Sequence, residues 1–101
     1  MSISGTFDIT VKTPVGEQVG VFLFIAEGER LTGSLTTPKG TVDLTDGKIT
    51  GNRVDFFTKI TTPMGKMKGR ITGTVEGNQL TAVAKLPLGS GQVHGLRREE
   101  E

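Results

Sequence analysis

The chain has 101 residues and a formal net charge of +1, from 12 Lys and Arg against 11 Asp and Glu. This length suits one domain spanning residues 1–101, and the balanced charge gives no bulk field to attract nucleic acid or an anionic membrane. Cysteine is absent and His94 is the single histidine, which excludes disulfides, thiol nucleophiles and cysteine-ligated metal sites. We expect no metal and no cofactor.

The start of the chain has neither the basic residues nor the apolar run of a secretory signal. The longest apolar stretch, residues 19–26, is far too short to span a bilayer. We therefore expect a soluble cytoplasmic protein with no membrane partner.

Apolar and polar residues alternate with a period of two along most of the chain, and helical periodicity is missing. The alternating segments are short and are bounded by turn residues, which is typical of strands. The eight predicted strands span residues 5–12, 17–26, 30–37, 41–50, 53–61, 66–75, 79–86 and 91–97.

Turns with the pattern Pro-x-Gly recur at near-equal spacing, beginning at Pro14, Pro38, Pro63 and Pro87. Proline presets φ for the second turn position and glycine accepts a left-handed conformation, so each turn is expected to be a hairpin loop. Further glycine turns fall between them, at residues 27–29, 51–53 and 76–78. The spacing indicates an internal strand-turn-strand repeat with all the Pro-x-Gly loops at one end.

The fourth predicted strand contains a break in its alternation. Val42 and Leu44 are in phase with one another, whereas Ile49 is out of phase after Asp46 and Gly47. A glycine within a strand is typical of a bulge, and we expect a bulge or corner there.

A one-sided sheet of eight strands has two exposed edges unless it closes on itself. We predict an all-β protein, an eight-stranded antiparallel up-and-down meander that closes into a small barrel. A two-sheet β-sandwich is the alternative. A barrel of eight strands is either filled by its own side chains or able to hold one small ligand.

The predicted inner faces of strands six to eight carry small residues, namely Gly69, Gly73, Ala82, Ala84 and Gly95. In one interpretation the large residues of the opposite wall pack down onto this thin wall. In the other, an apolar ligand cavity lies beside it. Arg97, on the inward phase near the end of the last strand, would then close the mouth, bind an anionic group or pair with a carboxylate at the rim.

Both faces of the second strand are apolar. The alternation assigns Val21, Leu23 and Ile25 to the core and leaves Phe22 and Phe24 outside. We expect these two rings, joined by Leu96 of the last strand, to be buried in an interface with another chain. Alternatively, the chain folds back over this strand, or the strand is central in a sandwich.

Polar residues supply no catalytic motif. His94 is expected to face outward, and no Ser, Asp or Glu stands at a spacing that would make it a catalytic base. Lys66, Lys68 and Arg70 alternate on the outer face of strand six, with Lys59 beside them, but no aromatic platform for bases is interleaved. This predicts a solvated strand face with ion pairs and no nucleic-acid site, and leaves open whether the protein is an enzyme.

Four strings, GTFDI at residues 5–9, LTGSL at 31–35, DGKITGN at 46–52 and GTVEGNQL at 73–80, resemble a small all-β, repeat-containing domain of uncharacterised bacterial proteins. The resemblance covers almost the whole chain and implies an appendage to larger enzymes. It offers no site residues to carry over. By architecture alone, the meander is similar to avidin-like and lipocalin-like barrels.

Two functional hypotheses follow. The first is a non-catalytic interaction or accessory module that forms a homodimer or docks on a larger protein through Phe22, Phe24 and Leu96. The alternative is a small barrel that binds or transforms a small apolar ligand in its interior.

Overall fold

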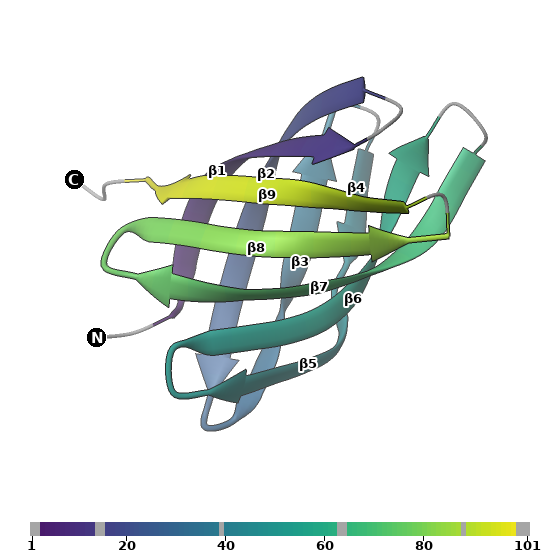
Figure 1. Ribbon diagram of the computed structural model, residues 1–101. Coiled ribbons are helices and arrows are strands. Elements are labelled where there is room, and N and C mark those ends of the chain that lie inside the picture. Colours follow the sequence, from purple (N-terminus) through teal and green to yellow (C-terminus); the bar gives the residue numbers. More distant parts are fainter. Residues whose placement is uncertain (1–2, 14–15, 39, 63–64, 88, 99–101) are drawn as a thin grey trace.

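The computed structural model describes residues 3–13, 16–38, 40–62, 65–87 and 89–98, with the backbone alone described for residues 13 and 60–62. All regular structure within these residues is β-strand (Figure 1). The strands are β1 (Gly5–Thr13), β2 (Gly16–Glu27), β3 (Arg30–Thr37), β4 (Gly40–Asp43), β5 (Thr45–Thr50), β6 (Arg53–Thr62), β7 (Gly65–Glu76), β8 (Gln79–Leu86) and β9 (Gly89–Arg97).

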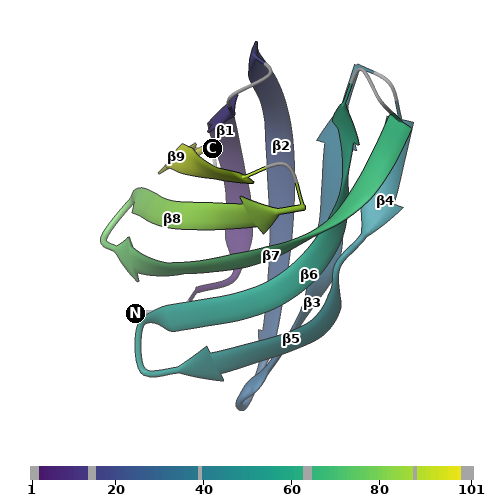
Figure 2. The same cartoon turned by 45° about the vertical axis from the view of Figure 1, so that its right-hand side comes forward.

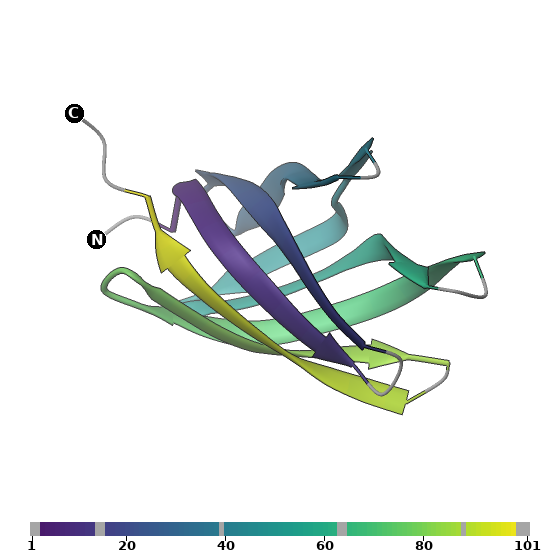
Figure 3. The same ribbon diagram turned by 90° about the horizontal axis from the view of Figure 1, so that it is seen from above.

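The strands form one antiparallel sheet in the order β2-β1-β9-β8-β7-β6-β5-β3-β4, and an additional pairing of β2 with β3 closes it. The closed ring contains eight strands, and β4 pairs with β3 as an extra strand (Figure 2). The predicted all-β meander and its closure into a barrel are confirmed, and the sandwich is not formed. Figures 1 and 3 show both chain termini at the same end of the barrel.

Two kinds of hairpin connect the strands at the two ends of the barrel. At the end opposite the termini, each Pro-x-Gly segment joins paired strands, as its flanking pairs Thr13–Gly16, Thr37–Gly40, Thr62–Gly65 and Leu86–Gly89 show. The predicted hairpin connections are confirmed, although residues 14–15, 39, 63–64 and 88 lie outside the described part. At the other end, Gly28, Gly51 and Gly77 have φ of 62°, 60° and 61° in two-residue loops, which matches the first position of type II′ turns.

The predicted fourth strand is divided into β4 and β5, with Leu44 between them. The pairing of β5 with β6 shifts register between Thr45 and Lys48, and Asp46 adopts a φ of 52°. A Cβ on Gly47 would stand 2.1 Å from the carbonyl oxygen of Leu31. The bulge predicted at this position is confirmed, and glycine permits the close approach of the two backbones.

Four fully buried phenylalanines fill the middle of the barrel: Phe7, Phe22, Phe24 and Phe56. The rings of Phe22 and Phe24 stack with their centroids 5.3 Å apart, and the ring of Phe56 meets each of them edge to face, at 5.3 and 5.6 Å. Such pairs add to the area that the rings remove from water. The aromatic cluster is therefore the centre of the core.

The predicted outward orientation of Phe22 and Phe24 is wrong. Both rings point inward, and Leu23 and Ile25 lie on the outer face with 41% and 45% of their surface exposed. Antiparallel register explains the reversal, because Phe22 stands opposite the inward-facing Phe7 of β1 and residues opposite one another share a face. The inner face of β2 therefore carries the larger aromatic side chains.

The small residues of the predicted thin wall lie on β7, β8 and β9. Gly69, Ala82, Ala84 and Gly95 are buried and Gly73 is half-buried. An added Cβ would stand 2.4 Å from Ala82 at position 73 and 2.8 Å from the side chain of Ile9 at position 95. Ala82 and Ile9 are the cross-strand neighbours of Gly73 and Gly95, so the glycines allow adjacent strands of this wall to approach closely. The choice between a filled interior and a ligand cavity beside this wall stays a prediction.

Candidate functional site

Arg97 closes the barrel at the end where the termini lie. Its guanidinium group stands over the ring of Phe7, 4.7 Å from the ring centroid, and donates hydrogen bonds to the carbonyl oxygens of Ser4 and Gly77. These contacts hold Arg97 across the end of the barrel, and its roles as a stopper, an anion ligand or the partner of a rim carboxylate stay predictions. The contact with the aromatic ring compensates for the partial burial of the charge.

The segment before β1 completes this closure. The side chain of Ile3 is buried with the core, and the side-chain oxygen of Ser4 accepts a hydrogen bond of 2.8 Å from the backbone nitrogen of Ala26. Gly5 has φ of 149°, and a Cβ there would lie 2.6 Å from the guanidinium of Arg97. The glycine therefore leaves room for the guanidinium of Arg97.

A small hollow lies at the opposite, Pro-x-Gly end of the barrel. Its apolar lining comes from five strands and includes Val11, Phe22, Leu35, Val42 and Ile71. The lysines Lys59 and Lys66 also line it, and both side chains are exposed. The space within it that water can reach is about 20 Å³, enough for roughly one water molecule.

The outer face of β2 carries a row of aliphatic side chains, which we call the β2 aliphatic row: Val19, Val21, Leu23 and Ile25. Val19, Leu23 and Ile25 have 58%, 41% and 45% of their surface exposed. Leu96 on β9, one strand beyond β1, is 61% exposed and outward as predicted. An apolar outer face on β2 therefore exists, but aliphatic side chains form it in place of the two rings.

The residues beside the β2 aliphatic row are uncharged for the most part. On β3 its opposite residues are Thr36, Ser34 and Thr32, and on β1 they are Thr10, Asp8 and Thr6. Asp8 forms a salt bridge with Arg98, whose two hydrogen bonds hold the pKa of the Asp8 carboxyl below its usual value. The row is thus one strand wide, with a polar border.

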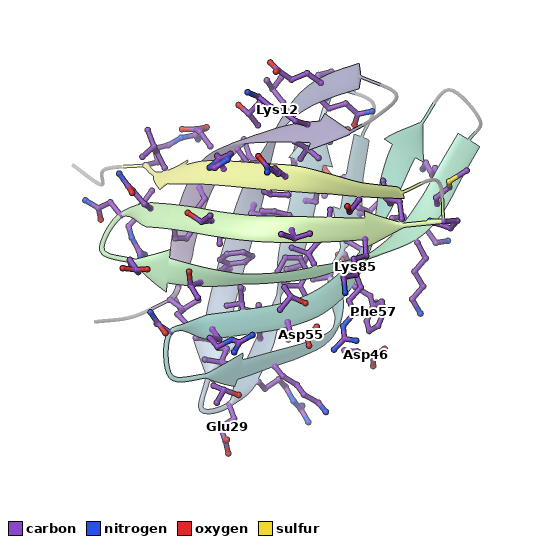
Figure 4. The ribbon with its side chains drawn as sticks, viewed as in Figure 1. Lys12, Glu29, Asp46, Asp55, Phe57 and Lys85 are labelled. Carbon is purple, nitrogen blue, oxygen red and sulfur yellow. The ribbon has the colours of Figure 1, made fainter. Side chains whose placement is uncertain are left out.

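The basic residues of β7 form a solvated face with an ion pair, as predicted. Arg70 donates two hydrogen bonds, of 2.6 and 3.1 Å, to the carboxylate of Asp55, and they lower the pKa of Asp55. Lys68 lies over the ring of Phe57, with its ammonium 4.8 Å from the ring centroid. Figure 4 labels Asp55 and Phe57 on β6. These contacts link the outer faces of β6 and β7.

His94 faces outward and is exposed, as expected, on β9. Within the described residues, no group of three His, Asp or Glu side chains could hold a metal ion. The described part also contains no helix long and apolar enough to cross a membrane. Thr58 carries the only buried polar side chain there, and its hydroxyl oxygen has no hydrogen-bond partner.

The residues that line the hollow were not identified as a site from the sequence. The sequence predicts that Lys59 and Lys66 belong to a solvated basic face, and it places Val42 only in phase with Leu44. The available signal was the proximity of both lysines to one hairpin, at residues 63–65, which places them together at one end of the barrel. The break in the fourth strand was a second signal for an irregular wall there.

We compared the chain with known proteins by sequence and by structure. No protein-family model matches the chain. The peroxynitrite isomerase of Salinispora arenicola (strain CNS-205) is 34% identical over 87 residues, a match that covers 77% of this chain and 44% of that protein. The chain therefore matches less than half the length of this relative.

Among solved structures, a redesigned β-barrel superposes with a TM-score of 0.66, at 20% sequence identity, covering 97% of this chain and 92% of the barrel. At this identity the likeness concerns the fold alone. It agrees with the closed antiparallel barrel described above.

Proposed function

We propose that this chain is a non-catalytic interaction module that self-associates through the β2 aliphatic row. The observation that carries the proposal is the exposure of Val19, Leu23 and Ile25 in one line on the outer face of β2, opposite the buried rings of Phe22 and Phe24. Scattered exposed aliphatic residues are normal on a protein surface, whereas a continuous apolar row typically marks a contact surface. A homodimer about a two-fold axis is the simplest arrangement that covers the row in both copies.

The size of the row limits the strength of this association. Full burial of a Val, Leu or Ile side chain contributes about 1.5 to 3 kcal/mol, so covering the exposed halves of three side chains in each copy contributes about 6 kcal/mol in total. Lost rotational and translational freedom offsets part of this gain. We therefore expect a weak homodimer, with a dissociation constant in roughly the millimolar range, and tighter docking on a larger protein that also covers β1 and Leu96.

The test is sedimentation equilibrium of the wild type over a concentration series up to about 1 mM. The variant Val19→Thr/Leu23→Thr/Ile25→Thr should remain folded and sediment as a monomer at every concentration, because threonine keeps the β-branched shape that strands favour. Val83→Thr is the matched control, since Val83 is a comparably exposed aliphatic residue on β8, away from the row. A wild type that stays monomeric throughout, or a triple variant that still dimerises, would contradict the proposal.

Isomerisation of peroxynitrite is a second candidate, because a relative that shares 34% identity over 87 residues carries that name. Among the described residues, the interior contains one buried polar side chain, Thr58, and no buried titratable one. The geometry therefore favours docking over this reaction. Peroxynitrite decay in the presence of the purified chain, with nitrate and nitrite measured as products, tests the candidate. A yield of nitrate above that in buffer would support it.

A further inference from the structure

The wall of the barrel contains an open seam between β4 and β6. β6 continues to Thr62, but its pairing with β5 ends at Phe57, opposite Thr45, and β4 pairs with β3 alone. No backbone pairing joins β4 to β6 in the part of the chain that the structure describes. Figure 3 shows the ends of β3 and β4 set apart from those of β6 and β7. The two sides of the seam can therefore separate without the loss of sheet hydrogen bonds.

The hollow at the Pro-x-Gly end adjoins this seam, because Val42 of β4 and Lys59 of β6 both line it. Among the described residues that line it, all but the two lysines are apolar or uncharged, and none is a carboxylate. Neither Lys59 nor Lys66 forms a salt bridge with a described residue. The hollow thus combines an apolar interior with two cationic groups at its rim.

Thr58 supplies an independent observation at the same seam. It follows Phe57, in the part of β6 that has no partner on the β4 side, and its side chain is 2% exposed. Its hydroxyl oxygen is buried with no hydrogen-bond partner among the described residues. A buried hydroxyl without a partner is costly, so a polar group that faces the interior here is unusual in an otherwise apolar core.

We propose that the hollow binds a short aliphatic monocarboxylate. The carboxylate lies between Lys59 and Lys66 at the rim, and the alkyl chain packs against Val42, Leu35 and Ile71. The space open to water is about 20 Å³, so the alkyl chain enters as the seam between β4 and β6 widens. The two ammonium groups favour an anion over a neutral alcohol. The apolar lining favours an alkyl chain, so a carboxylate with such a chain binds better than a fully polar anion.

The experiment is a chemical-shift titration of the ¹⁵N-labelled full chain with hexanoate, hexan-1-ol and hexylammonium. Hexanoate should shift the amides of Val42, Lys59 and Lys66, whereas the alcohol should bind at least about threefold more weakly and the ammonium should not bind. Charge-assisted contacts at exposed lysines are individually modest and screened by salt, so the hexanoate affinity should also fall as ionic strength rises. Failure of hexanoate to shift these amides, or equal affinity for hexan-1-ol, would overturn the proposal.

Two double variants test whether the lysines at the rim of the hollow bind the carboxylate of hexanoate. Lys59→Gln/Lys66→Gln should weaken hexanoate binding by about fivefold or more, while Lys12→Gln/Lys85→Gln should stay within about twofold of the wild type. The control removes the same charge from the same end of the barrel, but Lys12 and Lys85 are exposed on the outer wall and do not line the hollow (Figure 4). An equal loss in both double variants would show a non-specific charge effect and overturn the site.

Val42→Phe tests the apolar part of the site with a larger side chain on the half-buried edge strand. With its melting curve retained, this variant should lose the hexanoate shifts because the ring occupies the hollow. Undiminished binding in a folded Val42→Phe protein would place the ligand elsewhere.

Discussion

The reversed orientation of β2 makes opposite predictions for two adjacent residues, and the variants Phe22→Ala and Leu23→Ala test it. Phe22 is fully buried against the rings of Phe24 and Phe56, whereas Leu23 has 41% of its surface exposed. Truncation of a buried phenylalanine to alanine typically costs about 3 to 5 kcal/mol, through lost burial and the cavity left behind. For Leu23 we expect a loss of about 1 kcal/mol or less, because the side chain is half in water already.

The two losses differ enough to be read from melting curves. In a domain of about 100 residues, 1 kcal/mol shifts the melting temperature by roughly 4 to 8 °C, so Phe22→Ala should lower it by about 15 °C or more. Far-ultraviolet circular dichroism is the suitable probe, since the chain contains no Trp and no Tyr. If Leu23→Ala destabilises the protein as much as Phe22→Ala, the assignment of faces on β2 is wrong and the rings belong outside.

Three further predictions concern the core and one surface ion pair. Gly73→Ala should lower the free energy of unfolding by about 1 to 3 kcal/mol through overpacking, because the added Cβ would stand 2.4 Å from both Ala82 and the Thr81 carbonyl oxygen. An unchanged midpoint of urea unfolding would instead indicate open space there. Arg70 lowers the folded-state pKa of Asp55. The ion pair therefore stabilises the protein above the unfolded pKa of 3.8, and this contribution is lost as pH falls through the lower folded pKa. Asp55→Asn should flatten the acid limb of a plot of stability against pH, and a limb identical to that of the wild type would contradict this. Thr58→Val should raise stability.

The orientation of β2 could have been predicted from hairpin register. With a two-residue loop between Thr13 and Gly16, Phe7 of β1 comes opposite Phe22, and on the other side Leu35 of β3 comes opposite Phe22 as well. Opposite residues share a face, so two inward neighbours assign Phe22 to the interior. Alternation within β2 alone cannot decide between two apolar faces. The length of the hairpin loop fixes the register of β1 and β2, and the register decides which face of β2 is buried.

The rest of the barrel follows from local signals. The Pro-x-Gly spacing predicts the hairpins, and the phase break before Ile49 predicts the bulge that divides β4 from β5. The contacts of Arg97 and the seam beside β4 depend on which distant segments meet at each end of the barrel. Ser4 and Gly77, whose carbonyl oxygens Arg97 contacts, are far from it in sequence. Periodicity carries no information on such contacts.

Substitution of Thr58 tests whether its buried hydroxyl lacks a hydrogen bond in the folded protein. Its hydroxyl oxygen is buried without a hydrogen-bond partner in the described structure, and an unsatisfied buried polar group costs about 1 to 3 kcal/mol. Valine has nearly the same shape and no polar atom, so Thr58→Val should raise the free energy of unfolding by about 1 kcal/mol or more, which is about 4 to 8 °C in melting temperature.

Thr81→Val is the matched control for this substitution, because Thr81 is exposed on the outer face of β8. There the hydroxyl is solvated, and the change should stay within about 0.5 kcal/mol. A loss of stability in Thr58→Val that Thr81→Val does not share would show that the buried hydroxyl is hydrogen-bonded in solution. The description of the Thr58 hydroxyl as unpaired would then be incorrect. A gain would mean that the protein retains a destabilising polar group next to its open seam.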